Sequence, residues 1–148
     1  MRKITRFVSL VIVLGVLSGC NRQPTPEIVP VEGVVLLGGR PLPKATVRFI
    51  PNMDVGPEFI ASAVTDDQGK FVLECNGVSG APVGEHTVCV VESDPPEELL
   101  GENKQRELAQ YLRSLKNRPI PPGYASLVGG VSITISENQE PIELKLSR

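Results

Sequence analysis

The chain has 148 residues, of which 15 are basic, 17 are acidic and 3 are cysteine, with a single histidine and no tryptophan. This length accommodates one domain and a tether but no second hydrophobic core. The slightly acidic balance gives no electrostatic reason to bind nucleic acid, and aromatic residues at 4% do not supply the flat stacking surface that most sugar-binding modules use.

The first residues predict a secretory signal. Three basic residues, Arg2, Lys3 and Arg6, precede an apolar run of about eleven residues between positions 7 and 17. This run has roughly half the length of about twenty residues that a membrane-spanning helix needs. A cleaved signal is therefore favoured over a permanent transmembrane anchor.

The end of this signal, Leu17-Ser18-Gly19-Cys20, resembles the lipobox of bacterial lipoproteins. The resemblance implies that residues 1–19 are a signal peptide cleaved before Cys20, and that Cys20 carries fatty acyl chains such as palmitate. Each buried CH2 group contributes about 0.8 kcal/mol, so several acyl chains together anchor a protein stably. The alternative is an ordinary cleaved signal peptide in which Cys20 is incidental.

A lipidated Cys20 implies a place in the bacterial cell envelope, attached to a membrane and facing away from the cytoplasm. In the sorting pattern of such lipoproteins an aspartate after the cysteine favours the inner membrane, and here Asn21 favours the outer membrane instead. Residues 20–30 then form a lipidated tether, in which Pro24, Pro26 and Pro30 favour extended backbone of roughly 3 Å per residue. Loss of the signal leaves 12 basic against 17 acidic side chains, a net charge of about −5.

From Val31 onwards, apolar and polar residues alternate with period two in short segments separated by turn residues. We expect the first two strands to form a hairpin, and we expect Val47, Phe49, Phe71 and Leu73 to point inward. Seven such strands with turns between them predict a mainly β protein with a single seven-stranded β-sandwich. The expected strands are 31–37, 45–50, 59–65, 70–75, 86–92, 131–135 and 142–146.

One inserted helix is predicted over about 97–117, where apolar residues recur near helical spacing and acidic residues precede basic ones. Gly101 weakens its first turn by about 1 kcal/mol relative to alanine, so the firm helix is expected from about Glu102. We expect its apolar face to pack on one sheet. If the helix instead projects, Leu108, Tyr111 and Leu112 are the candidate partner-binding residues.

Several glycine- and proline-containing motifs, at 31–35, 39–49, 65–71, 80–88, and 120–124 followed by 131–135, have turn residues beside core residues. With these motifs the sequence resembles the carboxypeptidase regulatory-like family. The resemblance implies a prealbumin-like (transthyretin-like), Ig-like β-sandwich over residues 31–148 in a small bacterial lipoprotein, and it implies almost nothing about chemistry. The chain departs from the family pattern in its long helical segment, in His86, and in Cys75 and Cys89.

The only histidine, His86, would have to carry any Ser-His-Asp or Cys-His chemistry. By strand alternation it shares a face with Val88 and Val90, which favours a structural histidine in or beside the core. The segment 66–69 is explained as an Asp/Gly turn rather than a calcium loop, and one histidine with two cysteines cannot complete a zinc site. We therefore expect no catalytic residue, no metal and no cofactor.

Two cysteines are left once Cys20 is used for lipid. A disulfide between Cys75 and Cys89 would close a loop of about 15 residues and contribute about 3 kcal/mol. The alternation of side chains argues against this disulfide. Cys75 is expected on the inward face with Phe71, whereas Cys89 is expected on the face of its strand opposite to that of Val88. Both alternatives, a disulfide and two buried thiols, stay open at this point.

These observations favour a non-catalytic lipoprotein that binds a membrane through the anchor at Cys20 and acts as a structural or protein-interaction module for an unidentified envelope protein. Nucleic acid is not an expected partner. The alternatives are a carbohydrate- or ligand-binding module, or an accessory domain of an envelope enzyme.

Overall fold

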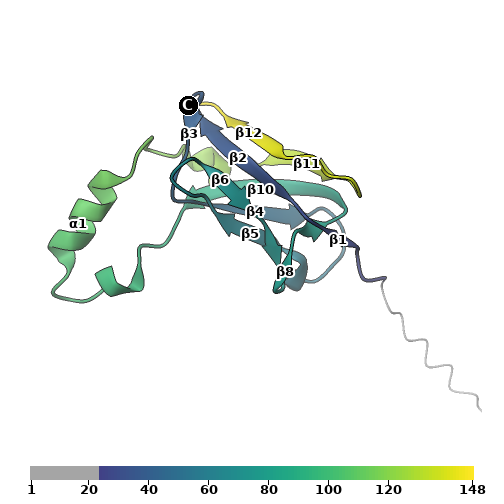
Figure 1. Ribbon diagram of the computed structural model, residues 1–148, viewed down its shortest axis with the longest axis horizontal. Coiled ribbons are helices and arrows are strands. Elements are labelled where there is room, and N and C mark those ends of the chain that lie inside the picture. Colours follow the sequence, from purple (N-terminus) through teal and green to yellow (C-terminus); the bar gives the residue numbers. More distant parts are fainter. Residues whose placement is uncertain (1–23) are drawn as a thin grey trace, which may run out of the picture.

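The computed structural model describes residues 24–148 (Figure 1). The predicted signal peptide, Cys20 and Asn21 lie outside the described residues. The helical elements are η1 (Pro57–Phe59), η2 (Glu97–Leu99), α1 (Gln105–Ser114) and η3 (Pro122–Ala125). The strands are β1 (Ile28–Val29), β2 (Glu32–Leu37), β3 (Arg40–Pro41), β4 (Ala45–Pro51), β5 (Ala61–Val64), β6 (Lys70–Val72), β7 (Glu74–Cys75), β8 (Val78–Ser79), β9 (Ala81–Pro82), β10 (Gly84–Glu92), β11 (Val131–Ile135) and β12 (Ile142–Leu146).

The strands form two larger sheets and one small one. The six-stranded sheet has the order β11-β10-β4-β5-β7-β8, and the four-stranded sheet joins β12, β2 and β3, with β6 also paired to β2. All neighbours are antiparallel except β12 and β2, which run parallel. The protein is therefore mainly β with one α-helix among the described residues, as the sequence predicts. The sheets and their loops, residues 24–92 and 118–148, are called the body below.

The predicted hairpin between the first two strands is wrong, because β2 and β4 belong to different sheets. A tight turn at Gly38 and Gly39, with φ of 60° and 78°, pairs β2 with the short strand β3 instead. The chain then crosses to the other sheet through Leu42, which is fully buried. The crossing is fixed by Thr65, whose hydroxyl donates to the Leu42 carbonyl at 2.7 Å and accepts from Ala45 N–H at 2.9 Å.

The expected strand at 70–75 is divided between the sheets. β6 pairs with β2, whereas β7 pairs with β5. Leu73 lies at the crossing, where its N–H donates to Val31 O at 2.9 Å and its carbonyl accepts from Gly80 N–H at 2.7 Å. Alternation of side chains continues through the crossing, which is why the sequence pattern does not reveal it.

One cluster of buried apolar side chains draws on both large sheets. The rings of Phe49 on β4 and Phe71 on β6 lie 6.1 Å apart, which places the facing sides of the two sheets in contact. Burial of Val47, Phe49, Phe71 and Leu73 confirms the inward positions expected from the sequence.

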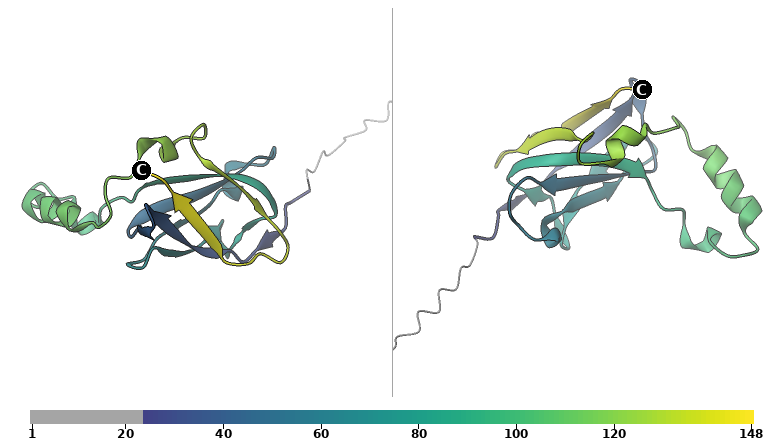
Figure 2. Two further views of the ribbon diagram at one scale, coloured as in Figure 1. Left: turned by 90° about the horizontal axis from the view of Figure 1, so that it is seen from above. Right: turned by 180° about the vertical axis from the view of Figure 1, so that it is seen from behind.

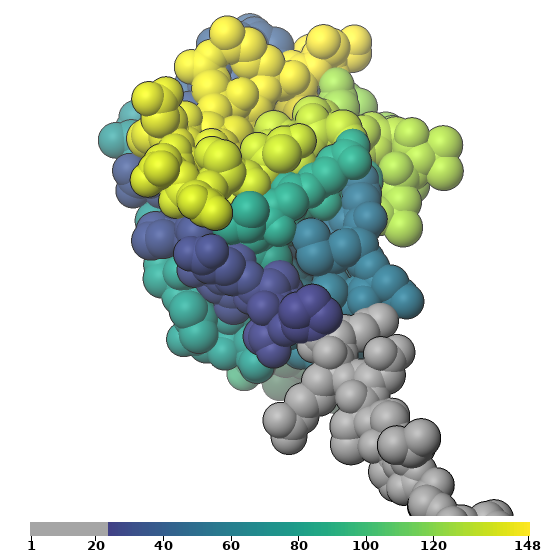
Figure 3. Space-filling model, turned by 90° about the vertical axis from the view of Figure 1, so that its right-hand side faces the viewer, coloured from purple at the N-terminus to yellow at the C-terminus, as the bar shows by residue number. Residues whose placement is uncertain are grey.

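The start of the described chain belongs to the body rather than to a tether. β1 pairs with β9, and Val29 is buried. Figure 3 looks onto this end of the molecule, where the purple segment lies against the neighbouring strands. Ile28 and Val29, which the sequence assigns to the tether, therefore belong to the body.

The inserted helix is shorter than predicted and does not pack on a sheet. α1 covers Gln105–Ser114, only the single turn η2 forms in the expected first part, and α1 has no buried residue. The expected packing is wrong, because the outer faces of β10 and β12 are not available to an apolar helix. η3 already lies against β10, and the outer side of β12 carries Glu143 and Lys145. Of the helices in residues 24–148, none has the length and apolar character that crossing a bilayer requires.

Candidate functional site

The segment between β10 and residue 118, residues 93–117, leaves the body and returns to it; we call it the arm. Figures 1 and 2 show η2 and α1 standing clear of the sheets. The arm and β1, where the described chain enters the body, lie at opposite ends of the molecule (Figure 1). The arm is thus the part of the described chain that departs most from the body.

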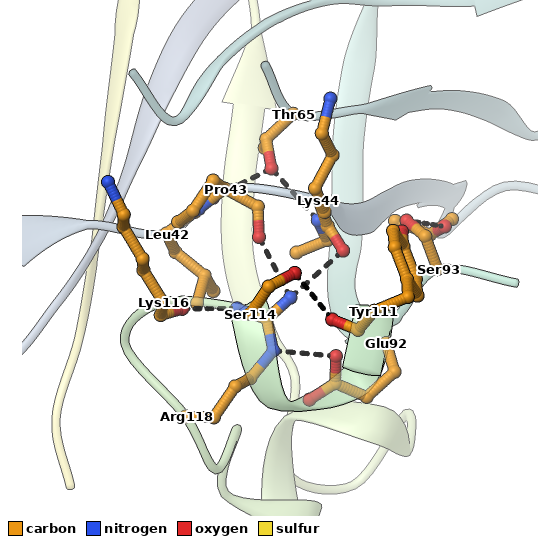
Figure 4. A network of polar contacts seen from close by, with 12 residues as sticks. Leu42, Pro43, Lys44, Thr65, Glu92, Ser93, Tyr111, Ser114, Lys116 and Arg118 are labelled. Carbon is orange, nitrogen blue, oxygen red and sulfur yellow. Dashed lines mark hydrogen bonds and ion pairs between the residues drawn. The ribbon is translucent and has the colours of Figure 1, made fainter. Parts of the chain in front are cut away.

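Arg118 holds the returning end of the arm (Figure 4). Its Nε donates to Glu92 Oε2 at 2.7 Å, which joins the residues on either side of the arm. Its Nη2 donates to Pro43 O at 2.8 Å and Lys44 O at 3.0 Å, and Nη1 donates to Lys116 O at 2.8 Å. The Arg118 side chain is only 15% exposed, so these charge-assisted bonds are partly shielded from water.

Asn117 completes the attachment from the other side. Its Nδ2 lies 3.0 Å from Leu37 O, 3.0 Å from Arg40 O and 3.1 Å from Pro41 O, at the turn between β2 and β3. Its Oδ1 accepts from Arg148 Nη2 at 2.5 Å. Its φ of 59° lies in the left-handed region, which asparagine tolerates better than most residues. Glu92, Asn117 and Arg118 together are called the clamp.

The helix of the arm presents one apolar stripe. Leu108, Tyr111, Leu112 and Leu115 are spaced by three, four and seven residues and therefore lie on one side of α1 and its C-terminal end. Leu112 is 49% exposed, and the other three are half-buried. The structure thus places the three predicted partner-binding residues, Leu108, Tyr111 and Leu112, on one accessible face.

The arm does not seal against the body even near the clamp. A pocket of about 280 Å³ separates Tyr111 and Leu115 from Pro43 and Lys44 of the body. At the first end of the arm, Ser93 and Thr46 share a hydrogen bond of 2.9 Å between their hydroxyls. The arm is therefore fixed at its two ends and free of tight packing along its helix.

A second surface feature is a groove of about 670 Å³ on the side of the four-stranded sheet. Its apolar lining includes the half-exposed or exposed Val34, Val64 and Val72, and Glu32, Asp66, Lys70 and Glu143 also line it. Sequence reasoning missed this groove because its residues come from four strands whose pairing the sequence does not state. The one sequence signal for the groove was the alternation of exposed valines with buried neighbours. This alternation is equally typical of any half-exposed strand, so it does not identify a groove.

The Asp66 turn at the groove matches the sequence expectation. Asp66 Oδ1 accepts from Gln68 N–H at 2.8 Å and Lys70 N–H at 2.9 Å. These two backbone donors hold the pKa of Asp66 below its ordinary value, so this carboxylate is ionised at neutral pH. The geometry is that of a turn-forming aspartate.

His86 is fully buried, as the strand alternation predicts. Its Nδ1 lies 3.1 Å from Gly84 O, its ring lies 6.0 Å from that of Phe49, and Nε2 has no hydrogen-bond partner in the described part of the chain. Burial lowers the pKa of His86, because the charged ring loses its hydration. Within residues 24–148, the one hydrogen bond of the His86 ring is therefore to a backbone carbonyl.

Acidification is expected to destabilise the protein through His86. The folded state holds the ring neutral, whereas the unfolded chain protonates it below its ordinary pKa of about 6.5. Stability that is present above this value is therefore lost as the pH falls from 7 towards 5.5. Urea unfolding at several pH values should show this fall in the native chain and a flatter profile in His86→Leu; equal slopes in both chains would contradict the assignment.

Both described cysteines are free and buried. Cys75 donates through Sγ to Glu58 O at 3.4 Å, and Cys89 lies opposite Arg48 on the face of β10 that Val88 does not share. Burial raises the pKa of both thiols. Of the two alternatives that the sequence left open, the structure has two thiols rather than a disulfide.

The thiols of Cys75 and Cys89 are expected to be unreactive in the folded protein, because they are buried and protonated. Iodoacetamide without reductant should modify neither in native buffer and both in concentrated guanidinium, as read by intact mass. A chain that stays unmodified in guanidinium until reductant is added would instead contain the disulfide.

Within residues 24–148, no group of three or more histidine, cysteine or acidic side chains could hold a metal ion. No protein-family model, curated protein or solved structure matches this chain.

Proposed function

We propose that this protein is a lipid-anchored, outward-facing envelope lipoprotein whose non-catalytic β-sandwich, of the carboxypeptidase regulatory-like and prealbumin-like type, presents a helical arm to a protein partner. The observation that carries the proposal is the clamp together with the partly exposed apolar stripe of α1. A segment that is fixed at both ends but leaves its apolar side in water gains stability when a partner covers that side.

The energetic argument begins with exposure. Full burial of a leucine side chain contributes about 1.5–3 kcal/mol relative to full exposure, and Leu112 is 49% exposed in this chain. A partner that covers Leu108, Tyr111 and Leu112 together would gain from all three. Tyrosine is among the residues that contribute most at interfaces, since it combines apolar area with a polar end and few rotatable bonds.

The clamp supports the same function through entropy. Arg118 and Asn117 bind five carbonyl oxygens of the body and hold the end of the arm in place before any partner arrives. Fixing a segment in advance lowers the ordering cost of binding. Such an attachment is therefore consistent with a role of the arm in binding.

The anchor gives the arm its direction. If Cys20 is the lipidated residue, about seven residues separate the membrane from β1, which span roughly 20 Å when extended. The arm lies at the end of the body opposite β1 (Figure 1). It would therefore face away from the membrane, towards other envelope components, with the outer membrane favoured by Asn21.

The absence of catalysis in this proposal is supported by His86, which is fully buried and bonded to Gly84 O. The carbohydrate-binding alternative receives no support from the groove, because its one aromatic residue, Phe71, is buried. A sugar would find no exposed ring on which to stack in that groove.

The anchor is tested by comparing the native full-length protein with Cys20→Ala. Native protein extracted from membranes with detergent should have the mass of a chain that begins at Cys20, plus several fatty acyl chains. Cys20→Ala should carry no lipid. Native protein without lipid would contradict the anchor.

The interaction is tested in the same membranes with Leu108→Ser/Leu112→Ser. Neither side chain is buried, so the fold should be kept. We expect a co-purifying protein to be lost at least tenfold from this variant and retained by Val78→Ser, whose site is 50% exposed on β8. Equal recovery from both variants would contradict a role for the arm.

A further inference from the structure

We propose that the partner of the arm is a second copy of this chain, whose groove beside β2, β6 and β12 receives the apolar stripe of α1. This inference rests on the proposed function, because it names the partner of the same arm. It is carried by two complementary surfaces of the described chain that the fold leaves uncovered.

The groove offers apolar area to its occupant. Val64 and Val72 are 56% and 60% exposed, and Val34 lies half-buried between them and β12. These three side chains line the same hollow of about 670 Å³. Single exposed valines are ordinary on a protein surface, but a lined hollow suits an inserted side chain.

The charge of the groove is negative. Glu32, Asp66 and Glu143 line it together with one cation, Lys70, and Glu143 is also paired with Lys145 at 2.7 Å, so one acidic group remains in excess. The turn donors that lower the pKa of Asp66 keep it anionic. An occupant with apolar side chains flanked by positive charge therefore fits best.

The part of the arm that contains α1 has that composition. Between positions 104 and 116 it carries Lys104, Arg106, Arg113 and Lys116 against a single acid, Glu107. Glu107 lies 3.7 Å from Lys104, and the other three cations form no ion pair with any residue in the described chain. The part of the arm that contains α1 thus combines the apolar stripe with an excess of positive charge, whereas the acidic side chains Asp94, Glu97, Glu98 and Glu102 lie in the part before it.

The arm does not occupy the groove of its own chain. The clamp fixes it to the turn between β2 and β3, and its pocket with the body lies at Lys44 and Asp67 rather than at Val34 or Val72. Because arm and groove are different surfaces, the contact between copies is heterologous: each molecule can give an arm to one neighbour and accept an arm from another. Two copies could also exchange arms reciprocally.

The test uses full-length protein in membranes and two differently tagged copies. One copy carries Leu112→Cys in the arm and the other carries Val72→Cys in the groove; both sites are about half-exposed or more, so both variants should fold. After mild oxidation with diamide we expect a disulfide-linked dimer that contains both tags. Replacing Val72→Cys by Val78→Cys, an exposed site on β8 outside the groove, should lower the yield at least tenfold.

Charge provides the second readout. Adding Glu32→Lys and Glu143→Lys to the groove copy should lower the yield of the linked dimer several-fold, and raising the salt concentration should lower it in the parent pair. An unchanged yield in both cases would contradict the proposed charge complementarity.

Three results would overturn the inference. The first is the absence of a linked dimer with Val72→Cys. The second is a dimer formed by Leu112→Cys alone, which indicates pairing of two arms. The third is an internal disulfide in a single chain that carries both Leu112→Cys and Val72→Cys. If the first occurs while Leu108→Ser/Leu112→Ser still loses another protein, the proposed function stands and only the second copy is excluded.

Discussion

Replacing Phe49 with alanine is expected to lower the free energy of unfolding by about 3–5 kcal/mol. Phe49 is fully buried, and its ring lies 6.1 Å from that of Phe71 and 6.0 Å from that of His86. The two phenylalanines belong to different sheets, so the cavity would open where the sheets meet. A loss of this size is a large part of the 5–15 kcal/mol that stabilises an ordinary domain.

The measurement is reversible urea unfolding, with thermal unfolding as a second probe, where the midpoint should fall by roughly 10–20 °C. Val72→Ala is the matched control: it removes an apolar side chain from the exposed side of β6 and should cost within about 0.5 kcal/mol. If Phe49→Ala cost no more than this control, the two sheets would not share one core.

Replacing Arg118 with alanine is expected to cost about 2–3 kcal/mol and to release the arm. The change removes the ion pair with Glu92 and leaves the carbonyls of Pro43 and Lys44 without their donor. Hydrogen bonds to charged groups contribute about 1.5–3 kcal/mol, and a polar group left without a partner adds a penalty. The partial exposure of Glu92 keeps the total towards the lower end.

Hydrogen exchange separates the two effects. In Arg118→Ala, amides of α1 should exchange at least tenfold faster, while those of β4 and β10 should change only in proportion to global stability. Arg118→Lys keeps the positive charge but not the planar fork that reaches both Glu92 and the carbonyls, so it should restore only part of the protection. Unchanged exchange in α1 would show that the arm does not depend on the clamp.

The sequence predicts the strands better than their partners. Alternation placed Val47, Phe49, Phe71 and Leu73 inside correctly, because burial on one side of a strand leaves a local pattern. It did not reveal that β2 and β4 lie in different sheets, since that depends on buried Leu42 and on the bonds that Thr65 makes across 20 residues. A local pattern contains no information about such distant contacts.

The arm shows the same division. Helical spacing located Leu108, Tyr111 and Leu112 on one face, but the expectation that this face packs on a sheet was wrong. The missing information was that η3 lies against β10 and that charged residues cover the outer side of β12. The clamp was also out of reach, because Asn117 binds carbonyl oxygens 76–80 residues away in the chain.

The most direct test of the account is photocrosslinking in intact cells, with a photoreactive phenylalanine analogue in place of Leu112 in the full-length protein. The account predicts a covalent adduct with a protein, either a second copy or another envelope component, and no such adduct when the analogue replaces Val78, which is equally exposed on β8. Adducts of equal yield at both positions, or none at Leu112, would contradict the claim that the arm is the contact surface.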